Sequence, residues 1–391
     1  MACDIADSTF TCISHEAENC HRPSFLYSSR LHTNLMSSLL PAPNNKTILI
    51  TGVNGYIASN LAYYFLTSGY FIRGAVRSST KKAFVLNSSA FKPFASRIQI
   101  FIVPHITVED AFKEAVKGIF AIFHLATPIN FWSGTAKEVV NPAVNGTLGI
   151  LNAAHKHAGP ELQVFVYMSS LVTVLDPSNS PPHHYTSESW NTSAENAISS
   201  LANDERAPFG VLYSASKILA EKTVFNFSED MKPRFRIVSL IPGVVIGPPV
   251  LFPEKVQDIN GTIKPIWEVL SGENRGLPRI IGTGFWVDVR DLVGICCALI
   301  ESSKKPEIDR KRVIVVAGKG NLSVAARVLW EKYSERLGHL QVSERDGDVE
   351  VGGEMTFDVK DAEGLLGRTW MSYEKSVLDT AEALENYVDL T

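Results

Sequence analysis

Short apolar runs alternate with longer segments of mixed polarity between residues 46 and 317. The runs are nearly continuous in their apolar character, which is typical of strands that are buried on both faces. They predict strands at 46–52, 71–76, 98–103, 119–125, 163–168, 235–241 and 312–317. Apolar residues at helical spacing between these runs predict helices at 55–68, 108–117, 136–157, 210–230 and 291–301. The alternation indicates an α/β protein with a doubly wound parallel sheet.

This alternation becomes less regular after Pro242. Residues 243–285 contain several turns with proline and one predicted helix near 256–270, and two further helices are expected at 323–337 and 373–387. We expect these residues to form a smaller C-terminal lobe over the carboxyl edge of the sheet, where open α/β sheets bind ligands. The predicted organisation is a sheet domain over 46–248, an insertion at 176–208 directed toward the lobe, and a substrate-binding lobe over 249–391, of which 286–317 returns to the sheet.

The first 45 residues have neither a strand-like run nor sustained apolar periodicity, and we expect a disordered N-terminal extension. They lack the basic start and apolar core of a secretory signal, and they are not the Arg-rich, acid-poor sequence of a mitochondrial presequence. A cytoplasmic location is therefore expected. Our hypothesis is that translation begins at Met36, which would make residues 1–35 an artefact of the gene model.

The composition and net charge argue against several classes of function. Lys and Arg total 37 and Asp and Glu total 41, so the net charge is −4 and a nucleic-acid partner is not expected. No apolar run approaches the ~18 residues of a membrane span. The five cysteines lack zinc-site spacing, and His183 and His184 have no spaced third ligand, so no metal site is expected.

A glycine turn directly follows the first predicted strand and opens the first predicted helix. In the sequence TGVNGYIA (51–58), Gly52 permits a tight turn, Gly55 lets the backbone approach a pyrophosphate, and the small Ala58 permits close helix–strand packing. The helix N-terminus offers free N–H groups to phosphates. We interpret the turn as a dinucleotide site rather than a purely structural one, and the cofactor candidates here are Gly52, Asn54, Gly55, Tyr56 and Ile57.

The second predicted strand ends in a basic segment, Gly74-Ala-Val-Arg-Ser-Ser-Thr-Lys-Lys82. An NAD site would normally place Asp or Glu here to accept a hydrogen bond from the ribose 2′-hydroxyl. Arg77 and Lys81 stand here instead, and a guanidinium suits a 2′-phosphate. The segment predicts NADPH as the cofactor; the alternative is a solvated basic turn.

Tyr213 and Lys217 are four residues apart, so they lie on one face of a predicted helix. An ammonium near a phenol stabilises the phenolate and should lower the tyrosine pKa. Ser169 and Ser170 end the fifth predicted strand, at the edge where a nicotinamide should lie. A serine there could hold a carbonyl oxygen while Tyr213 gives its proton and NADPH gives hydride.

With these motifs, the chain resembles the extended short-chain dehydrogenase/reductase family, in the branch of fungal NADPH-dependent aldehyde and ketone reductases related to methylglyoxal reductase and dihydroflavonol reductase. The resemblance covers about residues 46–391. It rests on TGVNGYIAS, AVRS, FHLATP (123–128), VNGTL (144–148), MSS (168–170), YSASK (213–217), IPGVVIGP (241–248) and WVDVRDL (286–292).

The resemblance implies a Rossmann sheet and a set of site residues. By it, Ser170, rather than Ser169, forms the catalytic triad with Tyr213 and Lys217, and the last two also contact the cofactor. It further implies that the ribose and nicotinamide are flanked by Ala126, Pro128, Pro242, Gly243 and Val245. One departure is His105, which stands where the family usually has an Asp that contacts adenine.

The expected function is NADPH-dependent reduction of an aldehyde or ketone, with a polyketide-derived ketone of fungal secondary metabolism as one substrate class that the resemblance suggests. A 3β-hydroxysteroid dehydrogenase and a sugar-nucleotide epimerase are alternatives with the same fold, although epimerases favour an acid where Arg77 stands. A non-catalytic NADP-sensing regulator is the third alternative, but such sensors tend to lose the Tyr/Lys pair. The protein is expected to be a monomer or a homodimer.

Overall fold

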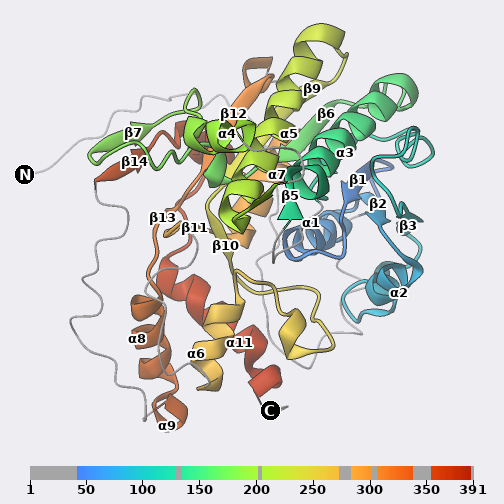
Figure 1. Ribbon diagram of the computed structural model, residues 1–391. Coiled ribbons are helices and arrows are strands. Elements are labelled where there is room, and N and C mark those ends of the chain that lie inside the picture. The colour runs from blue at the N-terminus through green and yellow to red at the C-terminus, as the bar shows by residue number, and fades with distance from the viewer. Residues whose placement is uncertain are drawn as a thin grey trace, which may run out of the picture. The chain divides into compact units, whose positions relative to one another are not determined.

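The computed structural model describes residues 42–127, 134–200, 205–272, 283–301, 306–337 and 354–388 (Figure 1). Met36 and the first 41 residues of the predicted N-terminal extension lie outside the described residues.

Seven parallel strands form the main sheet, in the order β3-β2-β1-β4-β6-β9-β12. They are β1 Thr47–Thr51, β2 Phe71–Val76, β3 Ile98–Ile102, β4 Ala121–His124, β6 Val164–Met168, β9 Arg236–Pro242 and β12 Lys311–Val315. The first three strands are added in one direction, after which the chain crosses back to place β4 beside β1. The predicted doubly wound parallel sheet is confirmed, and its topological switch point lies between the carboxyl ends of β1 and β4.

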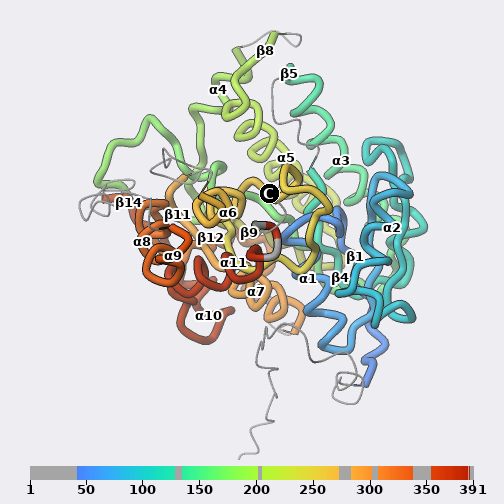
Figure 2. The backbone as a smooth tube through the Cα atoms, turned by 90° about the horizontal axis from the view of Figure 1, so that it is seen from below, coloured from blue at the N-terminus to red at the C-terminus, as the bar shows by residue number. Residues whose placement is uncertain are grey.

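Helices cover both faces of this sheet. Helices α3 Ala136–His157 and α5 Phe209–Met231 pack against each other, and so do α1 Tyr56–Thr67 and α7 Val289–Glu301. In Figure 2 the first pair lies on one side of the strands and α7 on the other. The alternation of side chains along each strand explains this, because successive residues face opposite sides of a sheet.

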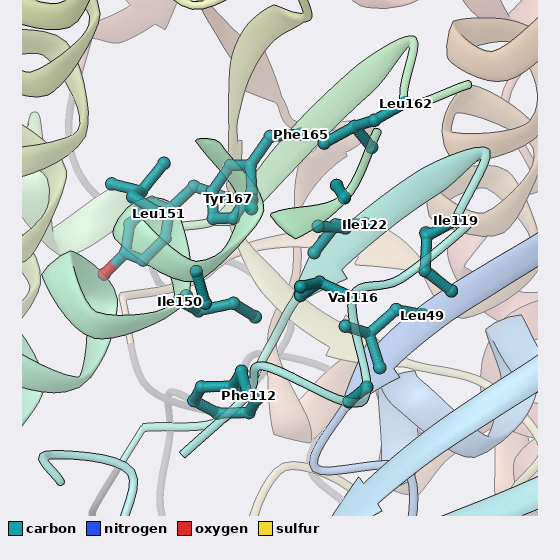
Figure 3. Close-up of a cluster of buried hydrophobic side chains, with 14 of the residues drawn as sticks. Leu49, Phe112, Val116, Ile119, Ile122, Ile150, Leu151, Leu162, Phe165 and Tyr167 are labelled. Carbon is teal, nitrogen blue, oxygen red and sulfur yellow. The ribbon is translucent and has the colours of Figure 1, made fainter. Parts of the chain in front are cut away.

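The core on the α3–α5 face contains side chains from one level of three neighbouring strands. Leu49, Ile122 and Phe165 come from β1, β4 and β6, and they form one buried cluster with Ile150 and Leu151 of α3 (Figure 3). On the opposite face the Phe123 ring lies 5.4 Å from that of Phe65 in α1. Full burial of such side chains contributes about 1.5–3 kcal/mol each, so the sheet provides a rigid base for the residues at its carboxyl edge.

The predicted helix at 108–117 is wrong, because this segment is a series of turns. Asp110 has a φ of 56°, in the left-handed region, which interrupts a right-handed helix. The backbone N–H groups of Ala111 and Lys113 donate three residues back, to Val108 and Asp110. The apolar spacing that suggested a helix instead buries Phe112 and Val116 in the α3–α5 cluster.

Several other boundaries differ from the prediction. The expected helix at 256–270 is divided into a short 3-10 turn, Val256–Asp258, and α6 Lys264–Ser271. The expected helix at 323–337 is divided at Tyr333 into α8 Leu322–Lys332 and α9 Ser334–Leu337. Helix α2 Ser79–Asn87 was not predicted, since Val85 is its one fully buried residue.

A second, three-stranded sheet continues from the carboxyl ends of β9 and β12. It consists of β10 Val244–Ile246, β11 Phe285–Asp288 and β13 Gly318–Lys319. Helices α6, α8 and α11 Tyr373–Val388 share a buried cluster with it. Of the segment 286–317, therefore, β12 joins the main sheet, whereas β11 joins this smaller sheet.

The segment 176–208 contributes β7 His183–Tyr185, α4 Thr192–Ser199 and β8 Arg206–Ala207. Strand β7 pairs with β14 Met355–Phe357, which precedes α10 Lys360–Leu366, and β8 pairs with β5 Gly134–Thr135. Helix α4 packs on α5, and an ion pair of 2.6 Å between Lys222 and Glu195 joins them. These contacts fix the segment beside the helix that carries Tyr213 and Lys217.

Candidate active site

The turn between β1 and α1 has the backbone geometry of a phosphate-binding turn. Gly52 has a φ of +67°, and its N–H donates to the Ala75 carbonyl at 2.8 Å, beside the end of β2. The N–H of Gly55 donates to the Gly52 carbonyl at 2.8 Å, and Gly55 begins α1 without a side-chain cap. The first-turn N–H groups of α1 are therefore not engaged by a capping side chain and can bind an anion.

The other predicted residues of this turn differ in what their side chains do. The Tyr56 ring is buried, and its hydroxyl donates to the Gly247 carbonyl at 2.7 Å. This side chain therefore ties α1 to the segment after β10, and the backbone of Tyr56 is the part that belongs to the turn. Asn54 and Ile57 are half-buried.

Two cations flank the start of α2 at the end of β2. Arg77 is exposed, and Ser78 caps α2 by accepting from the Lys81 backbone N–H at 3.3 Å. The Lys81 ammonium lies 5.7 Å from the centre of the Phe84 ring. Because Ala75 accepts from Gly52, the basic segment begins next to the glycine turn.

A buried polar group that the sequence analysis missed shapes the end of β4. Thr51 Oγ1 accepts from the N–H groups of Leu125 and Ala126 and lies 2.9 Å from His124 Nδ1. Thr147 of α3 lies 3.4 Å from His124 Nε2 and donates to the Ala143 carbonyl. These contacts turn the chain after His124 so that Ala126 faces Gly52.

The hydrogen bonds of this buried group determine which ring nitrogen of His124 carries the proton. Thr51 already accepts twice, so its hydroxyl donates to His124 Nδ1, and Nε2 carries the proton directed at Thr147. Burial, with the nearby charge of Lys217, lowers the pKa of His124 to about 3. The ring is therefore neutral at physiological pH. The available signal was a pair of polar residues, Thr51 and His124, at the ends of otherwise apolar strands.

The structure brings the three predicted catalytic residues to the carboxyl edge of β6. The Ser170 side chain lies close enough to Tyr213 to affect the pKa of its phenol. The Lys217 amine donates to Thr127 Oγ1 and to the Met168 carbonyl, each at 3.0 Å. The Tyr213 ring is stacked on Phe209, with ring centres 5.6 Å apart.

The two serines at the end of β6 have different environments. Ser169 is buried, and its hydroxyl donates to Glu221 Oε2 at 2.7 Å. Ser170 is half-buried and contacts Tyr213. The Ser169 hydroxyl is thus engaged in a buried hydrogen bond, and the Ser170 hydroxyl is the one beside the phenol.

The expectation that Lys217 lowers the tyrosine pKa is wrong for the structure. Burial raises the pKa of Tyr213, and the hydrogen bond from Ser170 opposes that rise only in part. Burial also lowers the pKa of Lys217 to about 8, against the opposing effect of Glu221. The physical reason is that desolvation disfavours the charged forms of both groups. At neutral pH the phenol therefore holds its proton and the amine is mostly charged.

The remaining predicted residues lie along the same edge, with one exception. The Cα of Ala126 would lie 3.4 Å from a Cβ added at Gly52. Pro128 lies outside the described residues. Pro242 and Val245 are buried at the β9–β10 junction. A Cβ at Gly243 would lie 2.5 Å from the Phe285 carbonyl oxygen, so packing against β11 requires glycine there.

Within the described ranges, no helix is long and apolar enough to cross a membrane. The same part of the chain contains no group of three or more His, Cys, Asp or Glu side chains arranged to hold a metal ion.

The chain is similar in sequence to several named proteins and in structure to a solved one. The chain is 28% identical over 344 residues to aldehyde reductase 2 of Sporidiobolus salmonicolor, covering 86% of this chain and 95% of that protein. It is equally identical, also over 344 residues, to the ketoreductase azaE of Aspergillus niger, covering 87% and 97%. The structure of yeast methylglyoxal/isovaleraldehyde reductase Gre2 complexed with NADPH has a TM-score of 0.73 at 24% identity, covering 88% of this chain and all of that one.

The family assignment rests on a wider match. The model of the NAD dependent epimerase/dehydratase family matches residues 48–317, which include the glycine turn, both serines that follow β6 and the Tyr213–Lys217 pair. This chain belongs to the NAD dependent epimerase/dehydratase family.

Proposed function

We propose that this protein is an NADPH-dependent carbonyl reductase that transfers hydride to an aldehyde or ketone. The observation that carries the proposal is that Ser170, Tyr213 and Lys217 gather at the carboxyl edge of the sheet: Ser170 follows β6 beside Tyr213, and the Lys217 amine donates to the Met168 carbonyl at the end of β6. The curated relatives support it, since they are named as an aldehyde reductase, a ketoreductase and an NADPH-dependent methylglyoxal reductase.

The residues at the switch point fit a dinucleotide phosphate. Gly52 adopts a φ that favours glycine, and the N-terminus of α1 carries no side-chain cap. Both features suit a pyrophosphate. The segment 74–82 contains no carboxylate, and Arg77 is exposed at the end of β2. This arrangement favours a 2′-phosphate over a free ribose hydroxyl and therefore favours NADPH over NADH.

The chemistry assigned to the protein's own residues is proton donation and orientation. When bound, NADPH supplies the hydride. The Ser170 hydroxyl holds the carbonyl oxygen, and Tyr213 gives the proton that this oxygen needs as it becomes an alkoxide. Because burial raises the tyrosine pKa, the phenol is protonated at neutral pH and ready to act as an acid. The charged Lys217 amine stabilises the phenolate that remains.

The finer assignments are part of the same proposal. We assign the cofactor to the domain 46–248 and the substrate to the lobe 249–391 together with the 176–208 insertion, which packs beside α5. The roles of Ala126, Pro242, Gly243 and Val245 in flanking the cofactor belong to this proposal as well. A polyketide-derived ketone as substrate, a cytoplasmic location and a monomeric or homodimeric state follow from the resemblance.

The proposal is tested by following NADPH absorbance with a panel of aldehydes and ketones. We expect wild-type protein to oxidise NADPH with at least one substrate class, and Tyr213→Phe to lower kcat by about 10²–10⁴-fold, the usual contribution of a positioned general acid. NADPH affinity, measured by fluorescence titration, should be retained in Tyr213→Phe, because the ring remains. Near-wild-type turnover of this variant would reject the assignment of Tyr213 as the proton donor.

A further inference from the structure

A buried carboxylate lies one helical turn beyond Lys217. Glu221 of α5 is fully buried and has three partners in or directly after three different strands. Its Oε2 accepts from Ser169, which follows β6, at 2.7 Å, and its Oε1 accepts from Ser239 of β9 at 2.7 Å and from the Arg312 Nε of β12 at 3.0 Å. Both oxygens are therefore fixed, and the carboxylate joins the catalytic helix to three strands of the sheet.

Arg312, the cation that pairs with Glu221, is itself held in place by further contacts. Arg312 is 7% exposed, and its Nη1 donates to the carbonyls of Ser187 and Ser189, each at 2.6 Å. Its guanidinium lies 3.5 Å from the centre of the Trp190 ring. Arg312 thus connects Glu221 to the 176–208 insertion that packs beside α5.

Stability alone is a weak reason for such a pair. Removing two charges from water costs several kcal/mol per ion, and well-packed apolar residues often replace a buried ion pair without loss. The location of the contacts suggests another role. Ser169 directly precedes Ser170, and Lys217 is on the same helix face as Glu221.

We propose that Glu221 is a positioning residue for the reduction: it fixes the Ser170 hydroxyl by anchoring Ser169, and it places a buried negative charge one helical turn from Lys217. This inference rests on the proposed function for the part that concerns Ser170. The part that concerns Lys217 is a property of the protein without substrate.

The groups around Lys217 make Glu221 the source of negative charge for the amine. On α5 the amine shares its environment with Tyr213, whose phenol is neutral, and with Glu221. From β4 it faces His124, which is neutral because its pKa is about 3. From β6 it faces the Tyr167 ring, 5.4 Å away, whose buried phenol has a raised pKa and is neutral.

Among the residues that the structure describes, the other contacts of the amine are uncharged, and the remaining nearby charge is that of Arg312. Thr127 and the Met168 carbonyl accept from the amine without carrying a charge. Arg312 reaches this region from β12 through Glu221, and a second cation disfavours the charged amine. Removing the charge of Glu221 therefore leaves two buried cations without their counter-ion, and the Lys217 pKa should fall below about 8.

The first test measures the amine directly. In protein labelled with ¹³C at lysine Cε, the Lys217 signal is assigned by its loss in Lys217→Met and titrated with pH. We expect Glu221→Gln to lower the Lys217 pKa by about one unit or more, and Glu221→Asp to restore part of it. An unchanged Lys217 titration in Glu221→Gln would overturn the assignment of Glu221 as the charge that holds the amine.

The second test separates positioning from stability and does not depend on folding of the charge variant. Ser169→Ala and Ser239→Ala each remove one buried hydroxyl that donates to Glu221 at 2.7 Å, so they should lose similar amounts of stability. We expect Ser169→Ala to lower kcat about tenfold, with NADPH affinity retained, because Ser170 loses its anchor. Ser239 pairs with Tyr167, three residues before Ser170, and does not adjoin Ser170 in sequence, so its variant should keep kcat within about twofold.

Equal kcat losses in the two serine variants, or none in either, would overturn the positioning role. If wild-type protein reduces nothing on the carbonyl panel, the proposed function fails, and the Lys217 titration still decides whether Glu221 keeps the amine protonated.

Discussion

The substitution Gly52→Ala tests the cofactor site, because the backbone conformation at this position favours glycine. Its φ of +67° lies in the left-handed region, which costs a residue with a Cβ roughly 1–2 kcal/mol. An added Cβ would also lie 3.4 Å from the Cα of Ala126, in the gap between the β1–α1 turn and the end of β4. We expect Gly52→Ala to lower the free energy of unfolding by about 1–2 kcal/mol. NADPH affinity should fall at least about tenfold, or 1.4 kcal/mol, because the methyl group keeps the pyrophosphate from the backbone.

Gly118 provides the matched control. Its φ is +63°, and a Cβ added there would meet no atom within 4 Å. Gly118→Ala should therefore show the same loss of stability in denaturant unfolding while NADPH affinity, from fluorescence titration, stays at the wild-type value. Equal losses of affinity in both variants, or wild-type NADPH affinity in Gly52→Ala, would rule out Gly52 as part of the cofactor site.

Two further predictions concern the cofactor's phosphate and the buried histidine. Arg77→Ala should raise the Michaelis constant for NADPH about tenfold, the value of a hydrogen bond to a charged group, with little effect on NADH; equal effects on both cofactors would remove Arg77 from the phosphate role. The folded-state pKa of His124 lies near 3, below its ordinary 6.5, so the unfolded chain binds a proton that the folded chain excludes. The unfolding free energy should therefore fall as the pH drops from 6.5 toward 3, at about 1.4 kcal/mol per pH unit from this residue. His124→Gln should reduce that slope by this amount in denaturant titrations at several pH values, and an unchanged slope would mean that His124 is not the group responsible.

The main sheet and the glycine turn could be predicted because their signals are local. A strand such as Thr47–Thr51 is an unbroken apolar run, and Gly52 and Gly55 follow it at fixed spacing. The pairing of Tyr213 with Lys217 is also local, since four residues bring two side chains to one helix face. Ser169 and Ser170 could be placed at the same edge because strand ends in a parallel sheet share one edge, and the choice of Ser170 came from the family resemblance.

Other features depend on contacts that the sequence does not display. The turns at 108–117 bury the same side chains that a helix would, and a single left-handed residue, Asp110, decides between the two structures. Helix α2 has almost no buried face, so no apolar period marks it. Glu221 and Arg312 are 91 residues apart, and their ion pair arises only when β12 is added to the sheet beside β9.

Burial by residues that are distant in the sequence also shifts the pKa values of the catalytic groups. The spacing of Tyr213 and Lys217 suggested a lowered tyrosine pKa, but the enclosure of both residues reverses that direction. This outcome changes the mechanism, because a protonated phenol suits the reduction of a carbonyl better than a phenolate does.

The most direct test of the central claim is the fate of the hydride. NADPH that carries deuterium at the transferred position of C4 is incubated with the protein and a carbonyl compound from the panel, and the product is analysed by mass spectrometry. We expect an alcohol with one deuterium on the former carbonyl carbon, formed by wild-type protein and not by Tyr213→Phe. A product without deuterium, or deuterium that stays on the cofactor with every carbonyl compound, would contradict this expectation.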